Sequence, residues 1–207
     1  MKFYNSVGPN PHVVRMFAAE RGVDLLKDCD VEDIDIMAGA NRQADYVAKN
    51  PGGQSPCIET DDGQYLAEIT ALCEYIDEKF PGESLMGQTP EERAANRMWT
   101  RRVDLYICEP LANGFRYSEG KPLFESRMTL LPEAADGLKA LAQEKITWLD
   151  GLMEGREFAG GDKIGLADVL LYCFLAFGAT VGQPLNTENK NITAWFERMQ
   201  ARPSASA

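Results

Sequence analysis

The segment from Asn50 to Glu59 constrains the fold more than any other part of the chain. It reads Asn-Pro-Gly-Gly-Gln-Ser-Pro-Cys-Ile-Glu, so a turn-rich stretch ends in an X-Pro bond and runs directly into a short apolar strand. X-Pro is the peptide bond that adopts the cis form at low cost, and we predict that Ser55–Pro56 is cis. Such a bond beside a strand leaves the N–H and C=O of Ser55 facing outward, where an extended peptide can pair with them.

Residues 1–80 predict the element order β-α-β-α-β-β-α. Strands are expected at 2–5 and 57–60, and Asn10 is a favourable N-cap for a helix with Pro11 at its first position. A later helix is indicated by an apolar stripe of Ile69, Leu72, Cys73, Ile76 and Phe80. This order, with a proline before the third strand, resembles a thioredoxin-like domain.

The rest of the chain shows helical periodicity. Residues 81–89 have the composition of a linker, and Thr89-Pro90-Glu91-Glu92 then predicts a helix start with a capping box. Residues 90–207 are expected to form an all-helical domain, and 203–207 a frayed tail. The predicted fold class is therefore α/β plus all-α.

Charge and cysteine usage limit the classes of partner. The 207-residue chain has a net charge of −11, which argues against nucleic acid or an anionic membrane surface, because both attract basic patches. No apolar run reaches the roughly 18 residues that a membrane span needs. Five cysteines without CxxC spacing predict free thiols in the cytoplasm and no metal site.

Two motifs resemble the glutathione transferase family. The segment 50–56, followed by Glu68, is similar to that family's N-P-x-G-x-[VS]-P and the acidic residue after it. The segment 161–168 is similar to G-D-x-x-[ST]-x-A-D, with Gly165 where Ser or Thr is usual and Asp168 expected to reach back to its N–H. The resemblance implies a thioredoxin-like glutathione-binding domain, a helical domain with the second substrate's pocket, and a homodimer.

Glutathione, the implied co-substrate, is a tripeptide with two carboxylates, one ammonium and a thiol. The resemblance assigns the ammonium to Glu68, at the N-terminal end of a helix whose free N–H groups take the nearby carboxylate. Ile69 stands where the family usually has Ser, so a hydroxyl contact is lost and the backbone donor stays. An acid in this position also stabilises its own helix, which is the alternative role for Glu68.

Four further positions match the family's ligand contacts or stand in for them. Ser55, before Pro56, would pair its backbone with the ligand's cysteinyl group, and Gln54 would touch a ligand carboxylate. Arg42 is the candidate for the glycyl carboxylate, with Lys49 as its alternative.

The group that ionises the thiol is harder to assign. Gly8 falls where most branches of the family have Ser or Cys, and Gly8 to Arg15 is similar to the G-P-x-P-x-x-V-R of a branch that lacks this side chain. The resemblance implies that backbone donors at the first helix hold the thiolate, aided by Asn10 and by a water on Tyr117 or Ser118. Tyr4 is expected to pack within its strand, and His12 to be a neutral surface residue.

These residues predict a glutathione S-transferase that conjugates the thiolate to a small apolar or aromatic electrophile. Two alternatives stay open. One is a glutathione-dependent lyase, isomerase or peroxidase, because the same fold hosts all of these. The other is a binding protein without turnover, which Gly8 and Ile69 favour more than a standard sequence would.

Overall fold

The computed structural model describes residues 1–207, which separate into two compact units, 1–86 with 203–207 and 87–202. None of the helices combines the length and hydrophobicity that crossing a lipid bilayer requires. All five cysteines are free thiols, and four of them are buried.

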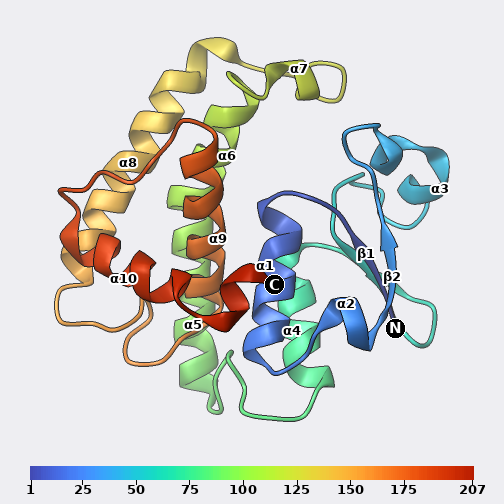
Figure 1. Cartoon of the computed structure of the whole chain (residues 1–207), viewed down its shortest axis with the longest axis horizontal. Coiled ribbons are helices and arrows are strands. Elements are labelled where there is room, and N and C mark those ends of the chain that lie inside the picture. The colour runs from blue at the N-terminus through green and yellow to red at the C-terminus, as the bar shows by residue number, and fades with distance from the viewer. The chain divides into compact units, whose positions relative to one another are not determined.

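The first unit is built on a four-stranded mixed sheet in the order β2-β1-β3-β4, of which Figure 1 labels β1 and β2. β1 pairs in parallel with β2 and antiparallel with β3, which pairs antiparallel with β4. The strands are Lys2–Asn5 (β1), Asp30–Asp33 (β2), Cys57–Glu59 (β3) and Tyr65–Leu66 (β4). The helical elements are Pro9–Glu20 (α1), Leu25–Asp28 (α2), Ala40–Arg42 (η1), Ala44–Val47 (α3) and Ile69–Lys79 (α4). The thioredoxin-like order is confirmed, with α2 and η1 as short additions.

Helix α1 begins two residues earlier than predicted. Its N-cap is Gly8, Pro9 is the first helical residue, and Asn10 lies inside the helix without a capping bond. The prediction of Asn10 as N-cap was therefore wrong. The reason is that the fixed φ of Pro9 suits the first helical position as well as that of Pro11 does, and Gly8 can turn the chain into it.

Helices α1 and α4 lie side by side against the sheet (Figure 1). Their facing sides are fully buried with the inward side chains of β1 and β3; these residues are Phe3, Val13, Val14, Phe17, Ile58, Leu72 and Ile76. Arg21, just after α1, lies 2.9 Å from the carboxylate of Asp77 in α4, and both side chains are buried. Arg21 also donates to the carbonyl of Phe80 at 2.8 Å, so this pair joins α1 to the end of α4.

The segment Pro203–Ser206 forms a 3-10 turn, η4, that packs on α1 and belongs to the first unit. The carbonyl of Ala205 lies 3.0 Å from Nε2 of His12, and Ser204 is buried and bonds Glu20. The expectation of a frayed tail was wrong, because these contacts join residues nearly 200 positions apart, which local sequence does not reveal.

The second unit is helical throughout, as predicted. Its elements are Pro90–Val103 (α5), Asp104–Cys108 (η2), Glu109–Arg116 (α6), Lys121–Phe124 (α7), Pro132–Ala134 (η3), Ala135–Leu152 (α8), Leu166–Thr180 (α9) and Lys190–Gln200 (α10). The capping box at α5 is confirmed: Glu92 N–H donates to Thr89 Oγ1 at 3.1 Å, and Thr89 N–H donates to Glu92 Oε2 at 3.2 Å.

A π-helical turn, η2, joins α5 to α6. Pro110 comes directly after this turn and Glu109. A proline has no N–H to donate to the carbonyl four residues before it, and its ring crowds that carbonyl. A widened turn is a common way for a helix to pass such a residue.

Helix α9 is the centre of the second unit. Its first ten residues, 166–175, are all buried, as expected for a helix that is apolar on every side. Asp168 is fully buried among them and accepts from the N–H groups of Gly165 at 3.0 Å and Ala159 at 2.8 Å, and from Trp195 Nε1 at 3.0 Å. The predicted reach of Asp168 back to Gly165 is confirmed.

Replacing Asp168 tests this buried cap. Burial raises the pKa of Asp168 to about 6, although its three donors oppose the shift. This folded-state pKa lies above the unfolded value near 3.9, so the side chain favours folding most at low pH. The free energy of unfolding should therefore fall by roughly 3 kcal/mol as pH rises from about 4 to about 6. Asp168→Asn should lack this slope and cost roughly 1–3 kcal/mol, because an NH2 group replaces one carboxylate oxygen and at least one of the three donors loses its acceptor. Urea unfolding of both proteins from pH 4 to 7 measures this, and parallel curves would contradict it.

Candidate functional site

The register of the sheet brings four segments to one edge. Tyr4 pairs with Cys57 across β1 and β3, so the two residues beyond them, Ser6 and Ser55, face each other. Ile58 pairs with Leu66 across β3 and β4, which places Glu68 beside Pro56. The start of α1, the loop before β3 and the start of α4 therefore meet where β1 ends.

Ser55 presents a free strand-like backbone at this edge. The Ser55–Pro56 peptide bond is cis, as predicted. Neither the N–H nor the C=O of Ser55 pairs with another backbone group, although Pro56 and Cys57 beside it are buried. The side chain of Ser55 accepts from Ser6 Oγ at 2.7 Å. An extended peptide can pair with this backbone, while the hydroxyl bond holds the residue in place.

The loop before Ser55 is held by the side chains of Asn41, Tyr46 and Asn50, and only Asn50 belongs to a motif that the sequence indicated. Asn41 Nδ2 donates to the carbonyl of Gly53 at 2.7 Å. The carbonyl of Gln54 accepts from Tyr46 Oη at 2.7 Å and from Asn50 Nδ2 at 2.8 Å. These bonds fix the backbone of Gln54 and leave its side chain exposed. A polar loop alone does not predict them, because they depend on where α3 folds back.

Of the two cations considered for a carboxylate, Arg42 contacts the loop that leads to Ser55. It is half-buried against Gly52 and Gly53, with Nη1 3.5 Å from the carbonyl of Gly52. Lys49 instead donates to the carbonyl of Asp45 at 2.9 Å and lies 5.6 Å from the ring centre of Tyr4. The geometry therefore favours Arg42 over Lys49 as a carboxylate ligand.

Glu68 has a backbone conformation that is rare for its residue type. Its φ is 69°, the one positive value in the chain outside glycine. Such conformations cost about 1–3 kcal/mol and cluster at ligand sites. Glu68 is the N-cap of α4, yet its exposed side chain makes no capping bond. The N–H groups of Ile69 and Thr70 have no backbone partner. This end of α4 thus offers a carboxylate beside anion-binding donors.

The start of α1 offers fewer donors than an ordinary helix. The first helical residues are Pro9, Asn10 and Pro11, and the two prolines have no N–H. The N–H groups of Gly8 and Asn10 remain, and neither has a backbone partner. Gly8 has φ 107° and ψ 176°, a region that is essentially limited to glycine. A side chain is thus excluded at Gly8 by backbone geometry, although the space around a Cβ there is open.

Tyr4, Cys57 and His12 do not present reactive groups at this edge. Tyr4 is buried and donates to Glu59 Oε2 at 2.8 Å, and burial with this carboxylate raises its pKa. Burial also raises the pKa of Cys57 to about 11, as expected for a packing residue. The pKa of His12 is lowered, chiefly by burial under η4, so His12 is not the surface residue that was expected.

Tyr117 and Ser118 lie in the second unit, directly after α6. Tyr117 N–H donates to the carbonyl of Asn113 at 2.9 Å. The hydroxyl of Ser118 donates to the carbonyl of Gly114 at 2.5 Å and contacts Glu119. Both residues are half-buried. Their role in holding a water stays a prediction.

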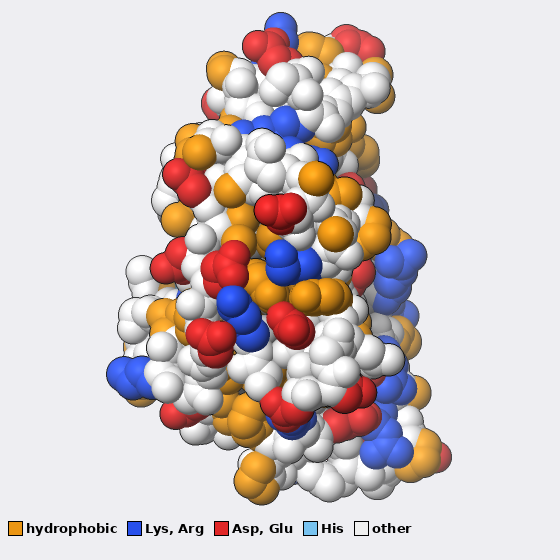
Figure 2. Space-filling model, turned by 90° about the vertical axis from the view of Figure 1, so that its right-hand side faces the viewer, with side chains coloured by type: hydrophobic (Ala, Val, Ile, Leu, Met, Phe, Trp, Pro, Cys, Tyr) orange, Lys and Arg blue, Asp and Glu red, His pale blue; other side chains and the backbone are white.

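Charged side chains of both signs are mixed on the face of the molecule in Figure 2. Within the first unit, Lys2 pairs with Glu32 at 2.7 Å and Lys79 pairs with Asp61 at 2.6 Å. Basic groups that are neutralised in this way give little attraction to a polyanion.

The chain is similar to known proteins over nearly its whole length. Residues 7–79 match the family model for the glutathione S-transferase N-terminal domain, and 130–203 match that for the C-terminal domain. Glutathione S-transferase 2 of Saccharomyces cerevisiae is 31% identical over 199 residues, covering 95% of this chain and 84% of that protein. Maleylacetoacetate isomerase of Pseudomonas aeruginosa is 29% identical over 154 residues, covering 70% of this chain and 68% of that protein.

Two solved structures share the fold. A glutathione S-transferase domain-containing protein from Marinobacter aquaeolei aligns with a TM-score of 0.93 and 32% identity, covering 99% of this chain and 100% of the other. Gtt2 from Saccharomyces cerevisiae aligns with a TM-score of 0.90 and 30% identity, covering 100% and 99%.

Replacing Gly8 tests whether backbone conformation excludes a side chain there. Gly8→Ala should lower the free energy of unfolding by about 1–3 kcal/mol, because alanine is strained in this conformation. Gly137→Ala is the matched control: Gly137 lies in α8 with open space around it, and alanine should stabilise that helix by up to about 1 kcal/mol. Chemical denaturation measures both changes. Equal stability of Gly8→Ala and the wild type would show that the position tolerates a side chain.

Proposed function

Since the chain belongs to the glutathione S-transferase family, we propose that it binds glutathione at the C-terminal end of β1 and conjugates its thiolate to a small apolar or aromatic electrophile. One observation carries this proposal: the unpaired backbone of Ser55, beside the cis bond to Pro56, lies next to the strained Glu68. A strand-like backbone and a carboxylate at a helix start fit a short peptide with a free ammonium group.

Each part of glutathione has a partner at this edge. The backbone of Ser55 pairs with the cysteinyl residue, and Glu68 takes the ammonium. The N–H groups at the start of α4, with Ile69 first, take the adjacent carboxylate, because free helix N–H groups and the helix dipole favour an anion. Gln54 and Arg42 are assigned to the ligand carboxylates, Arg42 to that of the glycyl end, where a guanidinium bonds a carboxylate strongly.

In this proposal the thiol is ionised by backbone groups. The N–H groups of Gly8 and Asn10 lie at the start of α1, and the dipole of a helix contributes up to about 2 kcal/mol in favourable geometry. That corresponds to roughly 1.5 pKa units, which brings a thiol near 8.5 toward neutrality. A water on Tyr117 or Ser118 supplies a further donor. The thiolate then attacks the electrophile.

The alternatives differ in the step that the ionised thiol would take. A glutathione-dependent isomerase, lyase or peroxidase would use the same thiolate, and the similarity to a protein named maleylacetoacetate isomerase supports keeping this class. A binding protein without turnover would hold glutathione and leave its thiol protonated.

The five free cysteines fit the reducing environment of the cytoplasm, which we propose as the compartment.

Changing Glu68 tests the binding mode. Glu68→Gln should weaken glutathione binding by about 1–1.5 kcal/mol, because the amide oxygen still accepts from the ammonium but the negative charge that attracts it is gone. Glu78→Gln is the matched control, since Glu78 is an exposed carboxylate on the same helix, far along from its start. Titration calorimetry on the folded variants measures both affinities. Wild-type affinity in Glu68→Gln would remove Glu68 from the site.

We also propose a homodimer, which is typical of this fold. The second unit exposes a group of large apolar side chains: Tyr106 and Trp148, whose rings lie 6.0 Å apart, with Leu105 and Leu141 on the same two elements. Exposed apolar patches of this kind are common at protein interfaces.

Light scattering should therefore give about twice the chain mass of 22.9 kDa. Trp148→Asp should shift the mass toward the monomer, because a charge in an apolar interface is costly. Leu131→Asp should leave the mass unchanged, since Leu131 is exposed outside this patch. A monomeric wild type at micromolar concentration would contradict the proposal.

A further inference from the structure

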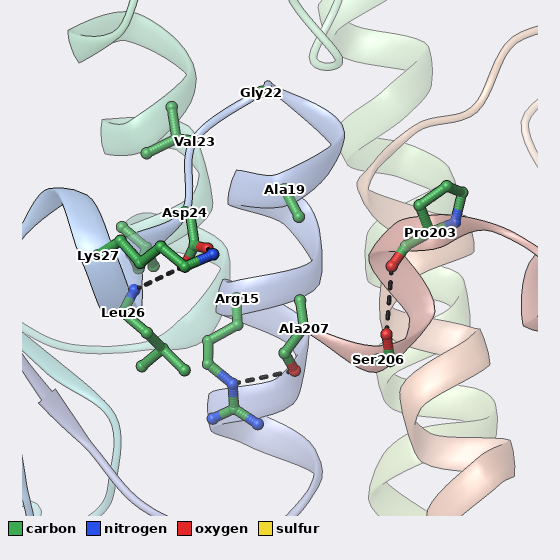
Figure 3. A pocket seen from close by; sticks show the side chains of 11 residues that line it. Arg15, Ala19, Gly22, Val23, Asp24, Leu26, Lys27, Pro203, Ser206 and Ala207 are labelled. Atoms are coloured by element: carbon green, nitrogen blue, oxygen red, sulfur yellow. Dashed lines mark hydrogen bonds and ion pairs between the residues drawn. The ribbon is translucent and has the colours of Figure 1, made fainter.

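Arg15 joins three segments of the first unit. From its place in α1, Nη1 donates to Asn5 Oδ1 at 2.6 Å and to the carbonyl of Ser6 at 3.4 Å. Its Nε donates to the carbonyl of Ala207 at 3.1 Å (Figure 3). Arg15 also lines a cavity of about 470 Å³ that is bounded by α1, α2 and the 203–207 segment. The Arg15 guanidinium thus bonds the end of β1, and it does so from a cavity whose lining includes none of the predicted glutathione ligands.

Ser6 extends this contact to the ligand edge. Its carbonyl accepts from Arg15, and its buried hydroxyl donates to Ser55 Oγ at 2.7 Å. On the other side, Asn5 Nδ2 donates to Asp33 Oδ1 at 2.8 Å, which ties the same strand end to β2. Hydrogen bonds therefore run from Arg15 through Ser6 to the residue that pairs with the ligand backbone.

The next two residues after Ser6 have little support. Val7 and Gly8 are exposed. The carbonyl of Val7 lies 3.3 Å from Ser6 Oγ, whose proton goes to Ser55, and the carbonyl of Gly8 accepts from His12 N–H at 3.4 Å. The N–H of Gly8 is one of the two donors that α1 keeps. The position of this donor therefore depends on how firmly the Ser6 peptide is held, and Arg15 is the charged group that holds it.

We propose that Arg15 is a positioning residue, which holds the Ser6 peptide so that the Gly8 and Asn10 N–H groups point at the thiolate. The proposal rests on the glutathione-binding function proposed above. A guanidinium suits this role because its planar fork donates to two acceptors at once in fixed geometry. Donors that are held in place before the ligand arrives stabilise a developing charge without reorganising, and this advantage is lost when the loop moves.

Arg15→Met tests the proposal. The pKa of the bound glutathione thiol, followed by thiolate absorbance, should rise toward that of free glutathione. Turnover near pH 7 should fall roughly tenfold, because small displacements of catalytic groups have large effects on rate. The deficit should shrink above about pH 8.5, where a free thiol ionises unaided. Arg15→Lys keeps the positive charge but lacks the planar guanidinium, so it should give an intermediate thiol pKa. This variant serves as the test if Arg15→Met does not fold.

Lys27→Met is the matched control, because it removes one positive charge from the same cavity. Lys27 pairs with Asp24 at 2.6 Å and contacts neither Asn5 nor Ser6. It should leave the thiol pKa and the turnover unchanged. A wild-type thiol pKa in a folded Arg15→Met protein would overturn the proposal, and so would an equal rise in Lys27→Met. Absence of glutathione binding to the wild type would instead overturn the function on which it rests.

Discussion

The pairing of β1 with both of its neighbours determines where Ser55 lies relative to Ser6 and the start of α1. β1 is four residues long, yet it pairs in parallel with β2 and antiparallel with β3. A shift of one residue in the second register would turn Ser55 away from Ser6 and move the cis bond away from α1. The core side chains Phe3 and Ile58, which pair with each other and are fully buried, hold that register.

In the proposed binding mode, recognition at this end of β1 relies on main-chain groups more than on reactive side chains. We assign to the ligand the backbone of Ser55, the N–H groups that follow Glu68 in α4, and those of Gly8 and Asn10 in α1. Backbone groups stay free for a ligand where the chain leaves regular helix and strand geometry. Three such features meet here: the cis bond before Pro56, the positive φ of Glu68 and the glycine-only conformation of Gly8. On this proposal, backbone donors take the place of a hydroxyl or thiol at the start of α1.

Much of the fold follows from local sequence signals. The strand at Lys2, the capping box at Thr89 and the cap at Asp168 each depend on residues within a few positions, and all are confirmed. The cis bond at Pro56 was predictable because the turn and the strand that flank it are both local.

The errors have physical causes that local patterns do not contain. Pro9 and Pro11 are equally suitable helix starts, and the choice depends on the conformation of Gly8. The 203–207 segment is ordered by His12 and Arg15, and the Ser6–Ser55 bond joins residues 49 positions apart. The positive φ of Glu68 has no sequence signal, because glutamate rarely adopts it. The ligand roles of all the candidate site residues stay predictions, including those of Ser55 and Glu68.

The central claim is that backbone groups of the first unit ionise the thiol of bound glutathione. The direct measurement is a pH titration of thiolate absorbance for glutathione with and without saturating protein. We predict that binding lowers the thiol pKa by roughly 1–1.5 units, the size expected for a helix N-terminus. Glutathione that binds tightly with an unchanged thiol pKa would contradict the claim and would identify the protein as a binding module.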